Sequence, residues 1–202
     1  MNKPVIDFDY SKEYFRINTK GNKSIVGNFQ YEVGLNYSKK LHFTTIDNIL
    51  HYGSYCKGGD FWRVSVPVGT PVFYDGPNEK SFGAETLLLI SKISVGEILT
   101  NFPDSYLDYI QLYNTDLTGV VFPEFVEQGF MLHDCKITSS TILPKSLGVG
   151  AFFKNCVIDG DVILPLELPD LKFINCEIDR RLKIDISLLG NAHFKNCRIC
   201  DL

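Results

Sequence analysis

A period of 20 or 21 residues runs through the second half of the chain and constrains its fold more than any other feature. Thr115 and four cysteines mark one position of this repeat: Cys135, Cys156, Cys176 and Cys197. The residue before each of them is Asn or Asp: Asn114, Asp134, Asn155, Asn175 and Asn196. The residue three places before each is apolar: Leu112, Leu132, Phe153, Phe173 and Phe194. The residue two places after each is also apolar: Leu117, Ile137, Ile158, Ile178 and Ile199. Self-similarity at one fixed period predicts a solenoid, in which equivalent side chains of successive coils stack into a shared core.

The repeat predicts β-structure. Residues 171–176 alternate apolar and polar side chains, which is the period of a strand. We therefore expect residues 99–202 to form a β-rich parallel solenoid of five coils, with the cysteine and asparagine columns arranged as ladders. We expect the asparagine side chains to bond to backbone groups at the turns. Small thiols that point into the core pack well without forming disulfides or binding a metal. We therefore expect free cysteines and no metal site.

Two resemblances leave the cross-section of the solenoid open. The unit that begins at Leu164 reads LPxxLxxLxFxxCxI and resembles the bacterial leucine-rich repeat, which has the same period. Apolar residues also recur every five positions, as at Phe153, Ile158 and Ile163, which is similar to pentapeptide-repeat proteins. The first resemblance implies a leucine-rich-repeat-like solenoid, and the second implies a four-sided right-handed β-helix.

Residues 1–98 carry no repeat, and we expect them to form a small α+β module that covers the first edge of the solenoid. Aromatic and β-branched residues predict strands at residues 29–33, 61–66 and 71–74, separated by turn signals. Residues 45–52 have helical spacing behind a Thr, which predicts a short helix.

Part of this module resembles a phage-associated family of unknown function. The matching text is GNFQYEVG at residues 27–34, Tyr37, LHF at residues 41–43 and HY at residues 51–52. The cysteines that flank the HF segment in that family are absent here. The resemblance implies a phage or prophage protein and supplies no activity.

The same module is similar to ADP-ribosyltransferases in the order of three features. Arg16 comes first, Thr44 lies in a Phe-Thr-Thr segment that stands for the family's Ser-Thr-Ser strand, and Glu85 precedes an apolar strand. In that family the Arg grips the NAD phosphate as a fork, and the Glu stabilises an oxocarbenium-like ribose. The resemblance implies Arg16, Thr44 and Glu85 as catalytic candidates. Gly83 replaces the family's first Glu, which argues against transfer to arginine.

Composition and motifs favour a non-enzymatic intracellular protein. The formal net charge of -4 does not favour nucleic acid or an anionic membrane surface as a partner. We find no export signal and no apolar run long enough to span a membrane. A reducing cytoplasm with free thiols is therefore expected, which is the host cytosol if a phage encodes the chain. The zinc-protease, serine-hydrolase and P-loop motifs are missing, and no cofactor or metal is expected.

These patterns predict an interaction protein that binds a host or phage protein through its solenoid surface. A virion structural protein and an ADP-ribosyltransferase-like enzyme are the alternatives. The sequence stops just after a full coil, without the polar capping unit that solenoids usually need. We expect this last coil to pair with another copy or another protein. The interface candidates are Cys197, Ile199, Cys200 and Leu202.

Overall fold

The computed structural model describes residues 3–24, 28–52, 59–75, 80–101, 106–107, 110–164, 171–182 and 192–200. The chain divides into two compact units, Met1–Ser94 and Val95–Leu202. Leu202, one of the predicted interface residues, lies outside the described residues.

The first unit is built around an antiparallel sheet of five strands. They are β1 (Tyr14–Asn18), β2 (Gly34–Thr44), β3 (Asp60–Ser65), β4 (Val72–Tyr74) and β5 (Ser81–Ile93). Strand β1 pairs with β2 and β3, and the long β5 pairs with β3 on one side and β2 on the other. These strands therefore close into a ring, while β4 is added to the first half of β5.

Aromatic side chains dominate the core of this unit. Tyr14 and Phe43 are buried, with the partly buried rings of Phe8 and Phe82 packed against them. The rings of Phe8 and Tyr14 are stacked at a centroid distance of 4.8 Å, and those of Phe43 and Phe82 at 5.5 Å. Aromatic pairs in such geometry add stability beyond the area they bury.

Several predicted elements of this unit are present. The strands expected at residues 61–66 and 71–74 are β3 and β4. The expected helix is one α-helical turn, α1 (Ile46–Ile49), followed by a 3-10 turn, η1 (Leu50–Tyr52).

The prediction of a strand at residues 29–33 is wrong, because the strand begins only at Gly34. The side-chain amide of Asn36 folds back on this segment: it donates to the Glu32 carbonyl at 2.8 Å and accepts from the Glu32 N–H at 3.0 Å. Both backbone groups of Glu32 are therefore satisfied by a side chain and not by a neighbouring strand.

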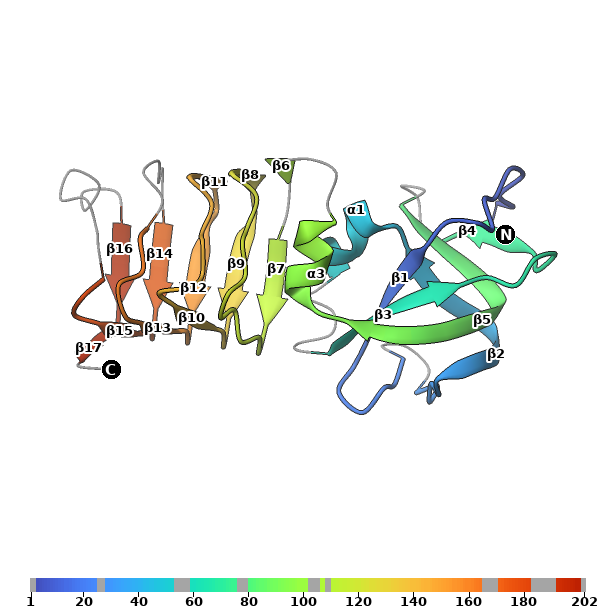
Figure 1. Cartoon of the computed structure of the whole chain (residues 1–202), viewed down its shortest axis with the longest axis horizontal. Coiled ribbons are helices and arrows are strands. Elements are labelled where there is room, and N and C mark those ends of the chain that lie inside the picture. The colour runs from blue at the N-terminus through green and yellow to red at the C-terminus, as the bar shows by residue number, and fades with distance from the viewer. Residues whose placement is uncertain are drawn as a thin grey trace. The chain divides into compact units, whose positions relative to one another are not determined.

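The second unit begins with the helix α3 (Val95–Thr100) and continues as a β-solenoid of about four turns, so the expected five coils are not confirmed. Three parallel sheets run along it, and Figure 1 shows the strands of successive coils side by side. The first sheet contains β7 (Ile110–Tyr113), β9 (Phe130–His133), β12 (Phe152–Lys154), β14 (Leu171–Ile174) and β16 (Ala192–Lys195). The second contains β10 (Lys136–Thr138), β13 (Val157–Asp159), β15 (Glu177–Asp179) and β17 (Arg198–Cys200). The third contains β6 (Tyr106–Leu107), β8 (Phe125–Gln128) and β11 (Ser146–Val149).

A fourth side of the coil is marked by the parallel bridge between Val121 and Ile142. The coils therefore carry extended backbone on several sides. A leucine-rich repeat instead alternates one strand with a helix or 3-10 segment.

The strand register confirms that equivalent side chains of the repeat stack. Phe153 pairs with Leu132 on one side and with Phe173 on the other, and Phe173 pairs with Phe194. The Phe173 ring lies parallel to its two neighbours, at centroid distances of 5.0 Å to Phe153 and 4.7 Å to Phe194. Phe153 and Phe173 are both 0% exposed, so this column is part of a core that the coils share.

The asparagine column lies at the corner between the first and second sheets. All five of its residues have a left-handed backbone, with φ between 48° and 55°. Asn and Asp adopt this conformation more readily than other residues with a side chain, which accounts for the column.

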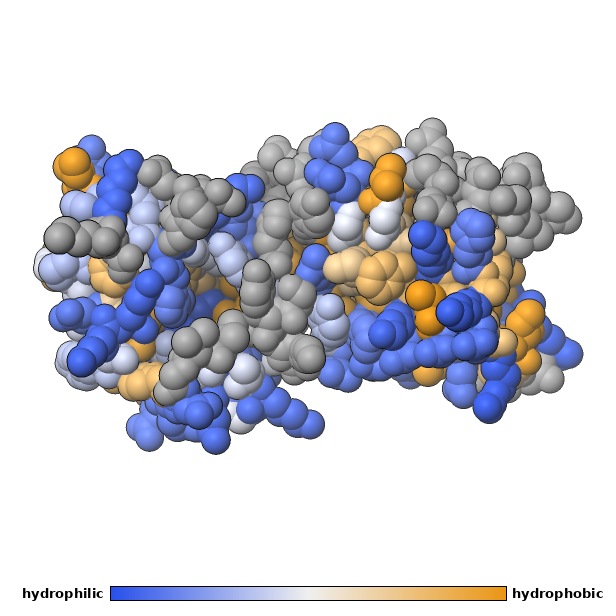
Figure 2. Space-filling view, turned by 180° about the vertical axis from the view of Figure 1, so that it is seen from behind, coloured by the Kyte–Doolittle hydropathy of each residue, from blue (hydrophilic) through white to orange (hydrophobic). Residues whose placement is uncertain are grey.

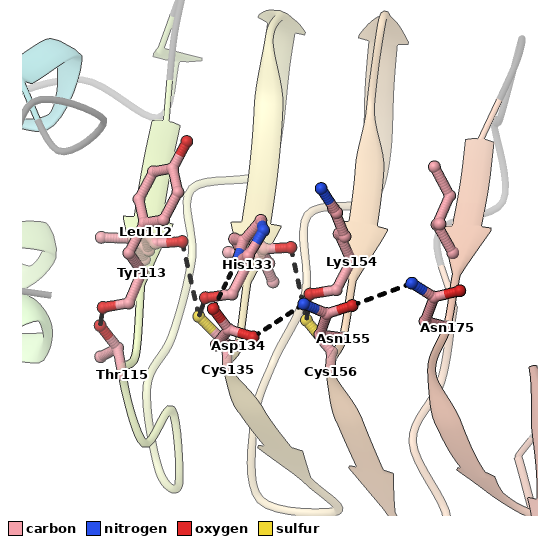
Figure 3. Close-up of polar contacts among 12 residues, drawn as sticks. Leu112, Tyr113, Thr115, His133, Asp134, Cys135, Lys154, Asn155, Cys156 and Asn175 are labelled. Carbon is pink, nitrogen blue, oxygen red and sulfur yellow. Dashed lines mark hydrogen bonds and ion pairs between the residues drawn. The ribbon is translucent and has the colours of Figure 1, made fainter. Parts of the chain in front are cut away.

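The side chains of this column form a ladder, as Figure 3 shows for three of its rungs. Asn155 Nδ2 donates to Asp134 Oδ1 at 3.0 Å, and Asn175 Nδ2 donates to Asn155 Oδ1 at 3.2 Å. Asn196 continues the ladder onto Asn175 at 3.3 Å. The expectation that these amides bond to backbone groups is wrong, because stacking brings each amide within reach of the next.

The cysteine column is a ladder of free, buried thiols at Cys135, Cys156 and Cys176. Each sulfur donates to a carbonyl of the preceding coil. The Cys135 Sγ, for example, lies 3.6 Å from the Leu112 oxygen (Figure 3). The neighbouring thiols of Cys135 and Cys176, together with burial, hold the pKa of Cys156 above its ordinary value. Cys156 therefore stays protonated and serves as a packing group, whereas the hydrogen bond with Cys156 lowers the pKa of Cys135 and lowers that of Cys176 to about 7.

Candidate functional site

A cavity of about 240 Å³ opens in the first unit, where β1 and β2 separate. Within the described residues, the backbone pairing of these two strands is confined to Phe15 with Thr44. The apolar part of the cavity wall consists of Phe15, Ile17, Phe43, Ile49 and Tyr52. The polar part consists of Arg16, Ser24, His42, Thr44, Asp75 and Ser81.

Arg16 spans the gap between the separating strands. It is only 4% exposed, and its NH1 group donates to the backbone carbonyl of His42 at 2.7 Å. Its Nε donates to the side chain of Asn18, and its guanidinium carbon lies 3.7 Å from the centre of the Tyr31 ring. The guanidinium is therefore held in one plane by hydrogen bonds and by a cation–π contact.

An ionic cluster of Lys40, His42 and Asp75 lies at the rim of the cavity. The Lys40 ammonium is 2.6 Å from one Asp75 oxygen, and His42 Nδ1 contacts the other. Burial lowers the pKa of His42, and the Asp75 carboxylate offsets this only in part, so the imidazole is neutral at neutral pH. Burial raises the pKa of Asp75, but the hydrogen bonds from Lys40 and His42 outweigh this and hold it below its ordinary value.

The cavity does not gather the predicted catalytic set. Arg16 and Thr44 line it, but Glu85 is exposed on β5 and is not part of its wall. The Thr44 hydroxyl donates to the Lys80 carbonyl at 2.6 Å, which directs its proton away from His42. The structure therefore brings Arg16 and Thr44 to one cavity and leaves Glu85 outside it.

Sequence reasoning missed His42 and Asp75 as partners. They are 33 positions apart. His42 belongs to the LHF segment of the phage-family resemblance, but no pattern links it to Asp75. Their contact depends on the pairing of both β2 and β4 with β5, which no local pattern reveals.

The last described coil contains three of the four predicted interface residues, Cys197, Ile199 and Cys200. Ile199 is 73% exposed, and Cys197 and Cys200 are half-buried. Burial raises the pKa of the Cys197 thiol, so this residue is not an activated thiolate. Phe194, which sequence reasoning assigned only to the core column, is 43% exposed.

A column of exposed aliphatic residues, the flank column, runs along the fourth side of the solenoid. Val121, Ile142 and Ile163 occupy equivalent positions 21 residues apart and are 54%, 57% and 66% exposed. Figure 2 shows apolar side chains interrupting a polar surface on the face turned away in Figure 1. Sequence reasoning missed this column, although its signal is present, since each member stands two places before a proline of the repeat.

Arg181 forms ion pairs with two acidic residues near one corner of the solenoid. Its NH2 group lies 2.6 Å from Asp179 and 4.0 Å from Asp159.

Across the described parts of the chain, no three His, Cys, Asp or Glu side chains converge as a metal site would require. None of the helices described here has the length and apolar composition of a transmembrane segment.

No family model matches the chain, and neither the curated proteins nor the solved structures contain a match to it.

Proposed function

We propose that this chain is a non-enzymatic interaction protein, whose solenoid binds other proteins and whose last described coil pairs with a second copy of the chain. The observation that carries the proposal is the exposure of core columns at that coil. Phe194 is 43% and Ile199 is 73% exposed, whereas Phe173 and Ile178, one coil earlier, are 0% and 4% exposed. Apolar columns that continue into solvent are the kind of surface that a partner covers.

The strand edges of this coil support the same proposal. Strand β16 pairs with β14 and strand β17 pairs with β15, and the described residues supply no strand for their outer edges. An unpaired edge flanked by apolar side chains is a template for another chain. A second copy suits this edge, because a two-fold axis would bury the same apolar surface of both chains in one interface.

The flank column supplies a second surface, suited to a different protein. The regular spacing of the coils fixes the positions of its three aliphatic side chains. Binding of a partner would therefore cost little conformational entropy on this surface. We infer from the resemblance at residues 27–34 that the setting is phage or prophage biology, with a host or phage protein in the cytoplasm as the partner.

Size-exclusion chromatography with light scattering at micromolar concentration tests the self-association. The wild-type chain is expected at about twice 22.9 kDa. Ile199→Glu places a charge in the proposed interface and is expected to elute as a monomer. Val149→Glu is the matched control, because Val149 is 71% exposed on another side of the solenoid. A monomeric wild-type chain, or equal effects of the two substitutions, contradicts the proposed pairing.

The flank column is tested by comparative capture from an infected-host lysate. A partner retained by the wild-type chain and by Val149→Glu, and lost by Ile142→Lys, supports a protein-binding flank. Identical captured proteins for wild type and Ile142→Lys contradict it.

A further inference from the structure

We propose that the cavity between β1 and β2 binds a small neutral molecule that consists of one aromatic ring and one hydrogen-bond donor, as in a phenol. This site is independent of the proposed protein-binding surfaces, which belong to the solenoid. Three observations carry the proposal: the aromatic wall of the cavity, the hydrogen bonds that already engage donors of that wall, and the acceptors that these bonds leave.

The cavity has the size and the lining of a site for a single ring. Its volume is about 240 Å³, whereas pockets for drug-sized molecules usually span roughly 300–1,000 Å³. The side chains of Phe15, Phe43 and Tyr52 contribute to its wall, with Ile17 and Ile49 beside them. Such a wall favours a flat apolar body over a sugar or an extended polar chain.

The buried Arg16 in the wall favours a ligand without charge. Its guanidinium donates to the Asn18 side chain and to the His42 carbonyl, and its carbon lies 3.7 Å from the centre of the Tyr31 ring. A buried anion needs hydrogen bonds in place of those that it gives up to water, and these donors would have to leave their present partners. The positive charge of Arg16 opposes a cation in the same cavity.

The hydroxyl groups of the wall present acceptor oxygens. The Thr44 hydroxyl donates to the Lys80 carbonyl at 2.6 Å, and the Ser81 hydroxyl donates to the Asp75 carbonyl. A hydroxyl that has donated its proton keeps its lone pairs as acceptors. The Asp75 carboxylate, which also lines the cavity, is a further acceptor. A ligand therefore gains hydrogen bonds here by donating them.

His42 adds an acceptor nitrogen to this wall. Its Nδ1 contacts the Asp75 carboxylate, which is ionised at neutral pH because its pKa lies below the ordinary value. An ionised carboxylate only accepts, so the proton of this contact belongs to Nδ1. Burial lowers the pKa of His42, so its imidazole is neutral at neutral pH and its Nε2 carries no proton. The donor of the ligand bonds to this nitrogen.

Titration of the full chain with four ring compounds at neutral pH, by isothermal calorimetry or ligand-observed NMR, tests the proposal. Phenol has a donor and no charge, fluorobenzene has nearly the same shape without a donor, and benzoate and benzylammonium carry opposite charges. We expect saturable binding of phenol. Fluorobenzene is expected to bind about three- to tenfold more weakly, because one hydrogen bond is lost, and each ion at least about tenfold more weakly.

Three outcomes of this titration overturn the proposal without the need for a variant. They are equal binding of phenol and fluorobenzene, binding of either ion as tight as that of phenol, and the absence of saturable phenol binding.

Three variants then locate the site. His42→Phe keeps a ring and removes the acceptor nitrogen, so it is expected to abolish the preference for phenol over fluorobenzene. Ile49→Phe fills the cavity and is expected to weaken both probes, with an unchanged circular dichroism spectrum as the check on folding. Glu85→Gln, which removes an exposed charge outside the wall, is expected to leave phenol binding unchanged. A preference that survives His42→Phe, phenol binding that survives Ile49→Phe, or phenol binding that is lost in Glu85→Gln overturns the proposed location.

Discussion

Truncation of Phe173 is expected to destabilise the solenoid more than any other single change in the aromatic column. Phe173 is fully buried and lies between two parallel rings, Phe153 at 5.0 Å and Phe194 at 4.7 Å. Phe173→Ala therefore removes a large buried side chain and both stacking contacts. Because the next coil on each side is built on the same column, we expect little collapse of the structure around the cavity that is left.

The magnitude follows from the burial. Truncation of a buried Phe to Ala costs about 3–5 kcal/mol, and we expect Phe173→Ala near the upper end because two stacking contacts are lost. Phe194 is 43% exposed and has one stacked neighbour, so Phe194→Ala is expected to cost about 1–2 kcal/mol from partial burial and one aromatic pair.

Urea unfolding of the full chain carrying Ile199→Glu, in which the proposed pairing of the last described coil is absent, measures these differences by far-ultraviolet circular dichroism. Phe125→Ala is the matched control for Phe194→Ala, because Phe125 is 44% exposed on the third sheet, outside the aromatic column. We expect the order of destabilisation to be Phe173, then Phe194, then Phe125. Equal losses for Phe173→Ala and Phe194→Ala would refute the reasoning that the column forms a continuous core.

Three further predictions concern the corners and ladders of the solenoid. Asn155→Ala is expected to cost about 1–2 kcal/mol, because Ala is strained in the left-handed conformation, and Asn155→Gly is expected to cost less; urea unfolding measures both. Hydrogen bonds from Arg181 hold the pKa of Asp179 below its ordinary value of 3.8. The ionised Asp179 carboxylate therefore contributes fully to stability above about pH 4, and this contribution is lost as the pH falls further. Asp179→Asn is expected to reduce the loss of stability at acidic pH. In the Ile199→Glu variant, in which the proposed pairing is absent, iodoacetamide is expected to label Cys200 in the native chain but Cys156 only after unfolding, as peptide mass spectrometry would show.

The solenoid could be predicted from the sequence because each structural position is repeated several times. The column of Phe153, Phe173 and Phe194 appears at one period, and stacking at that period is the arrangement that buries every member. The conformation of Asn155 could not be predicted in the same way. Its left-handed backbone is a property of the corner, and the same residue type would also suit a turn closed by side-chain-to-backbone bonds.

The first unit was harder to predict because its central strand lacks a strand-like pattern. All five residues of β1 are buried, including the polar Arg16 and Asn18, so the alternation of apolar and polar residues is lost. The cavity depends on this strand and on its brief pairing with β2 at Phe15 and Thr44. A resemblance in residue order suggested Arg16, Thr44 and Glu85 together, but residue order carries no information about which side of β5 Glu85 occupies.

The most direct test of the central claim is a solution measurement of which aromatic rings touch. In a chain with selectively labelled phenylalanine, the ring protons of Phe173 are expected to show nuclear Overhauser contacts to the rings of both Phe153 and Phe194, which lie 20 and 21 residues away. Contacts of Phe173 to neither of these rings, or to rings of the first unit instead, would contradict a core built by stacked coils.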